Sequence, residues 1–119
     1  MKAWLFILII PFVFTTCSKV EKDTQNACNS SNPLEDVTWL KTIKNTLTNC
    51  SCELSIIQGT YNNKTVYFVA LTDALCDGIS MPTLYDCNGK VVRVFNETDY
   101  QDFYNLVTRD KVLYRCKNQ

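Results

Sequence analysis

The chain has 119 residues, enough for one domain, and its twelve basic residues balance its twelve acidic ones. A near-neutral chain of this size lacks the basic surface that nucleic-acid binding requires, so no nucleic-acid partner is expected. The chain contains no histidine, the commonest general base and metal ligand, and this lowers the expectation of an enzyme.

The first sixteen residues have the pattern of an export signal. Lys2 precedes an uninterrupted apolar run over residues 4–14. This run is shorter than the ~20 residues that span a bilayer, and it contains Pro11, which disfavours a membrane helix. We therefore predict that residues 1–16 are a signal peptide and that the rest of the chain lies outside the cytoplasm.

The end of this run carries a second signal. Residues 14–17 read Phe-Thr-Thr-Cys and resemble the lipobox of bacterial lipoproteins, with Phe14 where leucine is usual. In a lipobox, small residues precede a cysteine that receives a diacylglycerol, so we expect a lipid on Cys17 that anchors the chain to a membrane. The alternative is ordinary secretory cleavage near Thr16, which would leave Cys17 as a plain thiol.

Cysteine parity favours lipidation. The chain has seven cysteines, and a lipid on Cys17 leaves an even number that can all form disulfides. These six disulfide candidates are Cys28, Cys50, Cys52, Cys76, Cys87 and Cys116.

A polar segment separates the predicted anchor from the domain. Residues 17–32 are predicted to be the lipidated cysteine and a flexible linker, which Cys28 would pin to the domain. One cysteine-rich domain is predicted over residues 33–119. It begins with a helix, because Asn32 and Pro33 are typical of a helix start. Apolar residues then recur at helical spacing to about Asn49: Val37, Trp39, Leu40, Ile43 and Leu47.

The middle of the chain predicts two hairpins. From Cys52 the apolar period changes to two, and the Asn62-Asn63 turn leads into a β-branched strand over residues 65–71. A loop follows over residues 72–81. Residues 83–85 and 91–95 then flank an Asn-Gly pair, which is a strong hairpin signal.

The last part predicts a helix and a strand. Thr98-x-x-Gln101 is a capping box for a helix whose inner face would carry Tyr100, Phe103, Tyr104 and Val107. Residues 111–116 form the predicted last strand. The fold class is therefore α+β: an antiparallel sheet of about five strands, two hairpins plus the C-terminal strand, with two helices packed on one face.

Four short motifs resemble those of small lipoproteins of the Bacteroidota. They are residues 34–40 (LEDVTWL), 50–52 (CSC), 58–62 (QGTYN) and 84–89 (LYDCNG). The resemblance extends over residues 34–116 and implies a lipid-anchored protein of the bacterial envelope. It implies no particular activity, because that family has none assigned.

The cysteines are the first candidates for chemistry. Six in a small exported domain are typical of a disulfide framework. Proximity in the predicted sheet favours three pairs: Cys76 with Cys87, Cys116 with Cys50 or Cys52, and Cys28 with the remaining member of that pair. A rival interpretation is a thiol–disulfide oxidoreductase using Cys50 and Cys52, although residues two apart on a strand are poorly placed for a mutual disulfide. No metal site is expected, since Cys-x-x-Cys spacing is absent.

Other polar groups predict no catalytic residue and no cofactor. Five loop aspartates fit turns and caps rather than a catalytic pair: Asp73, Asp77, Asp86, Asp99 and Asp102. Four sequons would matter only in a eukaryotic source: Asn29, Asn49, Asn63 and Asn96. Six tyrosines would make a binding patch if several shared an exposed face: Tyr61, Tyr67, Tyr85, Tyr100, Tyr104 and Tyr114.

The sequence as a whole predicts a membrane-anchored lipoprotein of the bacterial envelope, on the outer or inner membrane and facing outside the cytoplasm. Its expected role is non-enzymatic binding or scaffolding, through contact with another envelope protein. The alternatives are the oxidoreductase and a secreted eukaryotic disulfide-rich module.

Overall fold

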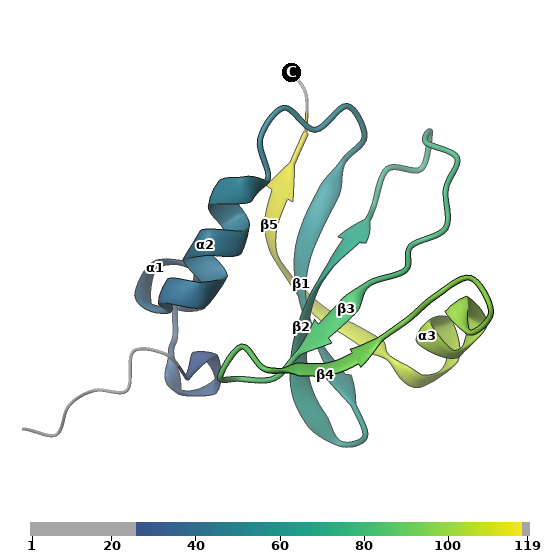
Figure 1. The fold of residues 1–119 in the computed structure, drawn as a ribbon. Helices are drawn as coiled ribbons and strands as arrows, with labels where there is room; N and C mark the ends of the chain where they lie inside the picture. The colour runs from purple at the N-terminus through teal and green to yellow at the C-terminus, as the bar shows by residue number, and fades with distance from the viewer. Residues whose placement is uncertain (1–25, 118–119) are drawn as a thin grey trace, which may run out of the picture.

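The computed structural model describes residues 26–117. Residues 1–25, with the predicted signal peptide and Cys17, and residues 118–119 lie outside the described part. One antiparallel sheet with strand order β4-β3-β2-β1-β5 forms the centre of the domain (Figure 1). The predicted α+β class with a five-stranded antiparallel sheet is confirmed.

Short helices open the described part: η1 (Ala27–Asn29, a 3-10 helix), α1 (Pro33–Asp36) and α2 (Thr38–Thr46). The sequence predicts one continuous helix here, but Val37 interrupts it with an extended backbone (φ −106°, ψ 113°). Val37 is only 1% exposed, so the break accompanies the burial of a β-branched residue that helices favour weakly. Ala27 is equally buried, so packing with the domain begins within the predicted linker.

The central hairpin follows the prediction closely. β1 (Leu54–Tyr61) and β2 (Lys64–Leu71) pair along their whole length. Asn62 and Asn63 have φ values of 49° and 60°, the left-handed backbone that a two-residue hairpin turn requires. β5 (Thr108–Cys116) pairs with the other side of β1, with two register shifts.

The second hairpin lies at the other edge of the sheet. β3 (Thr83–Tyr85) and β4 (Val91–Val94) flank the predicted Asn-Gly turn, in which Gly89 has a φ of 81°. β3 joins β2 through a single pair, Tyr67 with Tyr85. The two strands therefore diverge beyond this pair, as Figure 1 shows.

The helices lie on opposite faces of the sheet, whereas the sequence predicts both on one face. Ile57 and Phe68 belong to the cluster that contains Phe103 of α3 (Tyr100–Leu106). Their neighbours Ile56 and Val69 pack with α1 and α2 on the other face. The physical reason is that β1 and β2 carry apolar residues at consecutive positions, so each face needs its own cover.

The start of α3 differs from the predicted capping box. The helix begins at Tyr100 after Asp99, and no side chain caps it. The Thr98 hydroxyl instead donates to the side-chain oxygen of Asn96, 2.6 Å away. On the predicted inner face Phe103 is 1% exposed, but Tyr104 is 49% exposed.

Candidate functional site

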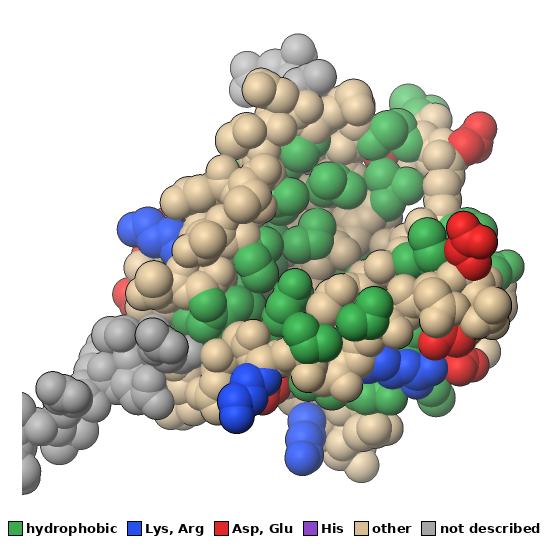
Figure 2. Space-filling model, in the orientation of Figure 1, with side chains coloured by type: hydrophobic (Ala, Val, Ile, Leu, Met, Phe, Trp, Pro, Cys, Tyr) green, Lys and Arg blue, Asp and Glu red, His purple; other side chains and the backbone are tan. Residues whose placement is uncertain are grey.

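A groove with a mixed polar and apolar lining lies between α2 and the beginning of β3. Its volume is about 370 Å³. Its lining comes from α2, β2, β3 and the segment before β3: Ile43, Thr46, Leu47, Val69, Met81, Pro82, Thr83 and Tyr85. Figure 2 shows this side of the molecule hollowed, with apolar side chains gathered in the hollow.

The divergence of β2 and β3 creates this groove. Past the Tyr67–Tyr85 pair, no ladder connects Val69 with Thr83 among the described residues. Ile43 from α2 packs on the same cluster as Val69, but it leaves the space towards β3 open. A second hollow of about 290 Å³ lies along the α2–β1 loop, and Thr46 and Leu47 line both hollows.

An aromatic group supports the sheet beside the groove. The Trp39 ring centroid lies 5.8 Å from those of both Tyr67 and Tyr85. Gly89 packs against the same indole, and a Cβ at position 89 would lie 2.8 Å from it. Tyr67 is buried, which raises the pKa of its phenol. Tyr85, which lines the groove, is therefore held in place by packed neighbours.

The groove has the chemistry of a binding surface. None of its eight lining residues carries a carboxylate, an amine, a guanidinium or a thiol. Tyr85, Thr46 and Thr83 contribute hydroxyl groups that can orient a ligand by hydrogen bonds. Such a lining suits apolar side chains that make a few polar contacts.

The six candidate cysteines form three disulfides. One of the two alternatives predicted for Cys116 is confirmed, because it bonds Cys50. The predicted pair of Cys76 with Cys87 is wrong, and so is the predicted partner of Cys28. The bonds are Cys28–Cys87, Cys50–Cys116 and Cys52–Cys76, with Cα–Cα distances of 5.3, 5.8 and 6.1 Å.

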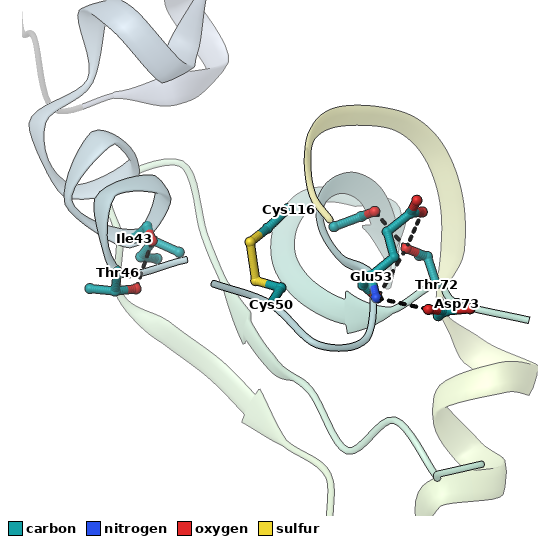
Figure 3. The surroundings of a disulfide bond; sticks show 8 residues. Ile43, Thr46, Cys50, Glu53, Thr72, Asp73 and Cys116 are labelled. Carbon is teal, nitrogen blue, oxygen red and sulfur yellow. Dashed lines mark hydrogen bonds between the residues drawn. A yellow bond between two sulfur atoms is a disulfide. The ribbon is translucent and has the colours of Figure 1, made fainter. Parts of the chain in front are cut away.

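Strand register explains the Cys50–Cys116 bond, which Figure 3 shows. Leu54 pairs with Cys116, so the end of β5 lies beside the segment that leads into β1. Asn49 adopts a left-handed backbone (φ 54°) just before Cys50. The chain therefore turns between α2 and β1, and this bond joins the turn to the last strand.

A hydrogen-bond network around Glu53 explains why Cys76 reaches Cys52 rather than Cys87. The Thr72 amide donates to the Glu53 carbonyl (3.0 Å), and the Glu53 amide donates to the Asp73 carboxylate (3.2 Å). Figure 3 shows Glu53, Thr72 and Asp73 close together. These bonds direct the loop that follows β2 back towards the start of β1, away from the second hairpin.

The same network lowers two carboxyl pKa values. Thr72 donates to the Glu53 side chain at 2.8 Å, and Arg115 does so at the same distance. The Thr72 bond lowers the pKa of Glu53 most, and the Arg115 bond adds to it. The Asp73 pKa is lowered by backbone N–H donors, first from Leu75 and then from Glu53.

The third disulfide attaches the N-terminal segment to the second hairpin. Cys28 bonds Cys87, and the neighbouring Ala27 amide donates to the Cys87 carbonyl at 2.7 Å. The prediction that Cys28 pins the predicted stalk to the domain is confirmed. The attachment point is the β3–β4 turn.

The two cysteines of the oxidoreductase interpretation lie in separate bonds. Cys50 bonds Cys116 and Cys52 bonds Cys76, so they do not form a dithiol pair with each other. Asp73 lies near the sulfurs of Cys52 and Cys76. Because both sulfurs belong to a disulfide, neither is the thiolate that a metal needs.

Four of the five candidate aspartates have structural partners. Asp73 accepts from the Leu75 amide (3.0 Å), and Asp86 accepts from two amides of its own turn. Asp99 and Asp102 both pair with Arg93, at 3.4 and 3.1 Å. The Asn96 amide lowers the pKa of Asp99 most, with Arg93 adding to it. Asp77 lies exposed in the loop.

The tyrosines and the sequons are spread over the surface and the core. Tyr61 packs against one face of the sheet and Tyr67 against the other, so the tyrosines do not share a single patch. The four sequon asparagines are all exposed. The groove itself was not predicted, because the helix pattern that contains Ile43 and Leu47 does not indicate where the covered area of the sheet ends.

No helix within residues 26–117 is long and apolar enough to cross a membrane. Comparison of the chain with protein-family models, with curated proteins and with solved structures finds no match. The candidate function therefore rests on the chain's own sequence and geometry.

Proposed function

We propose that this protein is a lipid-anchored binding module of the bacterial cell envelope. Cleavage after Thr16 leaves Cys17 as the lipidated first residue, and the folded domain faces outside the cytoplasm. The groove between α2 and β3 takes an apolar segment of another envelope protein. The protein works by binding and not by catalysis.

Three disulfides support the compartment in this proposal. Such bonds form and persist in oxidising surroundings and are rare in the cytoplasm. The signal pattern over residues 1–16 and the lipobox at Cys17 agree with export. All six cysteines in the described part are paired, so Cys17 is the one left for a lipid.

The groove is the observation that carries the binding role. Its lining combines apolar side chains with polar groups, and it lies beside packed aromatic rings. The second hollow shares Thr46 and Leu47 with it, so the two hollows together offer space for more than one side chain of a peptide segment. Preformed grooves of this kind bind with little loss of conformational entropy.

Intact mass tests the anchor. The full-length chain is produced in a bacterium with lipoprotein processing, and free thiols are alkylated before and after reduction. We expect the mass of a chain that begins at Cys17 and carries a diacylglyceryl group. We also expect this chain to be alkylated only after reduction. An unlipidated mass would contradict the anchor, and alkylation at Cys50 and Cys52 before reduction would favour the oxidoreductase.

Photo-crosslinking tests the groove. A benzophenone amino acid replaces Met81, which lines the groove, or Tyr104, which lies on α3 of the other face; the two are similarly exposed, at 44% and 49%. In intact cells we expect one discrete protein adduct from position 81 and none from position 104. Equal adducts from both positions, or none from position 81, would contradict a binding groove.

A further inference from the structure

The β4 edge of the sheet is exposed and apolar. β4 is the outermost strand on its side of the sheet. Three of its four residues are valines, and Val91, Val92 and Val94 are 57%, 45% and 57% exposed. Soluble proteins normally protect an edge strand with charges, bulges or a covering element.

The opposite edge has more of that protection. β5 carries Arg109, Asp110, Lys111 and Arg115, and two register shifts interrupt its pairing with β1. β4 has one charged residue, Arg93, and one register shift in its pairing with β3. The exposed valines of β4 are therefore a local feature and not a general property of this sheet.

The N-terminal segment leaves the domain beside this edge. The Cys28–Cys87 bond and the Ala27–Cys87 hydrogen bond hold the start of the described chain against the β3–β4 turn. β4 begins immediately after that turn, at Val91.

The tether is short. About nine peptide units separate Cys17 from Asn26, and at ~3.5 Å each they span at most ~30 Å. A lipid on Cys17 therefore keeps the β3–β4 hairpin within one short tether of the membrane surface.

From these observations we infer that β4 is a membrane-contact edge, resting its valines on the lipid surface to which Cys17 is attached; this inference rests on the proposed lipid anchor. Short tethers give effective concentrations in the millimolar range, so even a weak contact is formed much of the time. The contact is interfacial: the valine side chains reach the acyl boundary while the outer backbone groups of β4 stay hydrated among the headgroups.

Two lysines lie at this end of the domain together with Asp86 and Asp110, whose carboxylates accept hydrogen bonds from the turn amides and from Thr60 and Thr108. Lys90 precedes Val91, and Lys64 lies in the β1–β2 hairpin at the same end of the sheet. Both are exposed, and neither pairs with a carboxylate within residues 26–117. Figure 2 shows basic side chains along this lower edge, below the apolar ones. Lysines beside an apolar edge favour anionic headgroups.

Fluorescence quenching by brominated lipids tests the inference. The lipidated protein is reconstituted into vesicles of phosphatidylethanolamine and phosphatidylglycerol with bromine on the acyl chains. Val92→Trp places a reporter on β4, and Leu75→Trp is the matched control in the loop after β2, where Leu75 is 96% exposed. Trp39, present in both variants, supplies an equal background. We expect at least threefold stronger quenching for Val92→Trp.

Equal quenching of the two variants would overturn the membrane contact. The emission of Val92→Trp could instead shift to the blue as protein density on the vesicles rises, without being quenched. That result would show that β4 contacts a second copy of the chain, and it would also overturn the membrane contact. Intact mass of the same sample separates the two proposals. A lipidated but unquenched protein contradicts only the β4 contact, whereas a protein without lipid contradicts the anchor and the contact together.

Discussion

The two faces of the sheet are covered to different degrees. On one face Phe103 of α3 packs edge-on against Phe68 and Phe95, with ring centroids 5.3 and 5.4 Å apart, and all three are almost fully buried. On the other face α2 buries Tyr67 but leaves the groove open beside Val69. The closed face contributes to stability, and the open face retains a surface for binding. Each of the following predictions tests one side of this contrast.

The largest effect is expected on the closed face. Phe103→Ala removes a ring from a packed aromatic cluster, and it should lower the free energy of unfolding by about 3–5 kcal/mol. Leu47→Ala at the groove should cost less than about 1 kcal/mol, because its side chain is only partly buried. Urea unfolding of the oxidised protein measures both. Similar losses would mean that the two faces contribute equally to stability.

The next effect concerns the disulfides at the far end of the open face. Replacing Cys50 and Cys116 together by serine opens a bond with a sequence separation of 66, and it should cost about 2–4 kcal/mol. The matched control replaces Cys52 and Cys76, whose separation is 24. Because the Cys52–Cys76 bond already shortens the loop that Cys50–Cys116 closes, loop-closure entropy makes the cost of the control only about 0.5 kcal/mol smaller. Thermal unfolding without reductant compares the two, and the reverse order would show that local packing outweighs chain entropy.

A smaller effect is expected beside the groove. Gly89→Ala places a Cβ against the Trp39 indole at a residue with a φ of 81°, so it should cost about 1–2 kcal/mol. It should also shift the Trp39 emission, since the ring must move. Asn88→Ala in the same turn is the control and should leave the emission unchanged. An unshifted emission in Gly89→Ala would show that Trp39 is not confined by this contact.

The smallest effect is a pH dependence. Because hydrogen bonds from Thr72 and Arg115 lower the pKa of Glu53 below its ordinary value of 4.5, its contribution is present above that pH. The contribution is lost as the pH falls through the lower pKa of the folded state. Glu53→Gln should therefore flatten the decrease in stability below about pH 4.5. Urea midpoints across that range measure this, with Glu97→Gln as the exposed control; equal slopes in both variants would contradict it.

Local signals predicted much of this fold, because they depend on neighbouring residues. Neighbouring residue types alone favour the turns at Asn62-Asn63 and Asn88-Gly89. They also favour the strand over residues 65–71. The break at Val37 and the exposure of Tyr104 depend on tertiary packing, which a helical period does not contain. Consecutive apolar residues in β1 and β2 indicate that both faces of the sheet are covered, and this pattern could have predicted α3 on the opposite face.

The candidate site was less predictable than the fold. A disulfide map depends on which loops meet, and fifteen pairings are possible for six cysteines. Cys76 bonds Cys52 because of hydrogen bonds between Glu53 and Thr72, which are distant in sequence. The groove depends on how far β3 diverges from β2, and no residue pattern reports that distance.

The three disulfides also define how far the protein can be stretched. A pull between the N-terminal segment and the C-terminus passes through Cys28–Cys87, back along the chain to Cys76, across to Cys52 and Cys50, and out through Cys116. This covalent path contains about thirteen peptide units of ~3.5 Å and three disulfides that each add about 6 Å, so Cys28 and Cys116 can lie no more than about 63 Å apart even when the domain is unfolded. The path includes β3 and the rim of the groove, so tension on the chain would act directly on the binding surface.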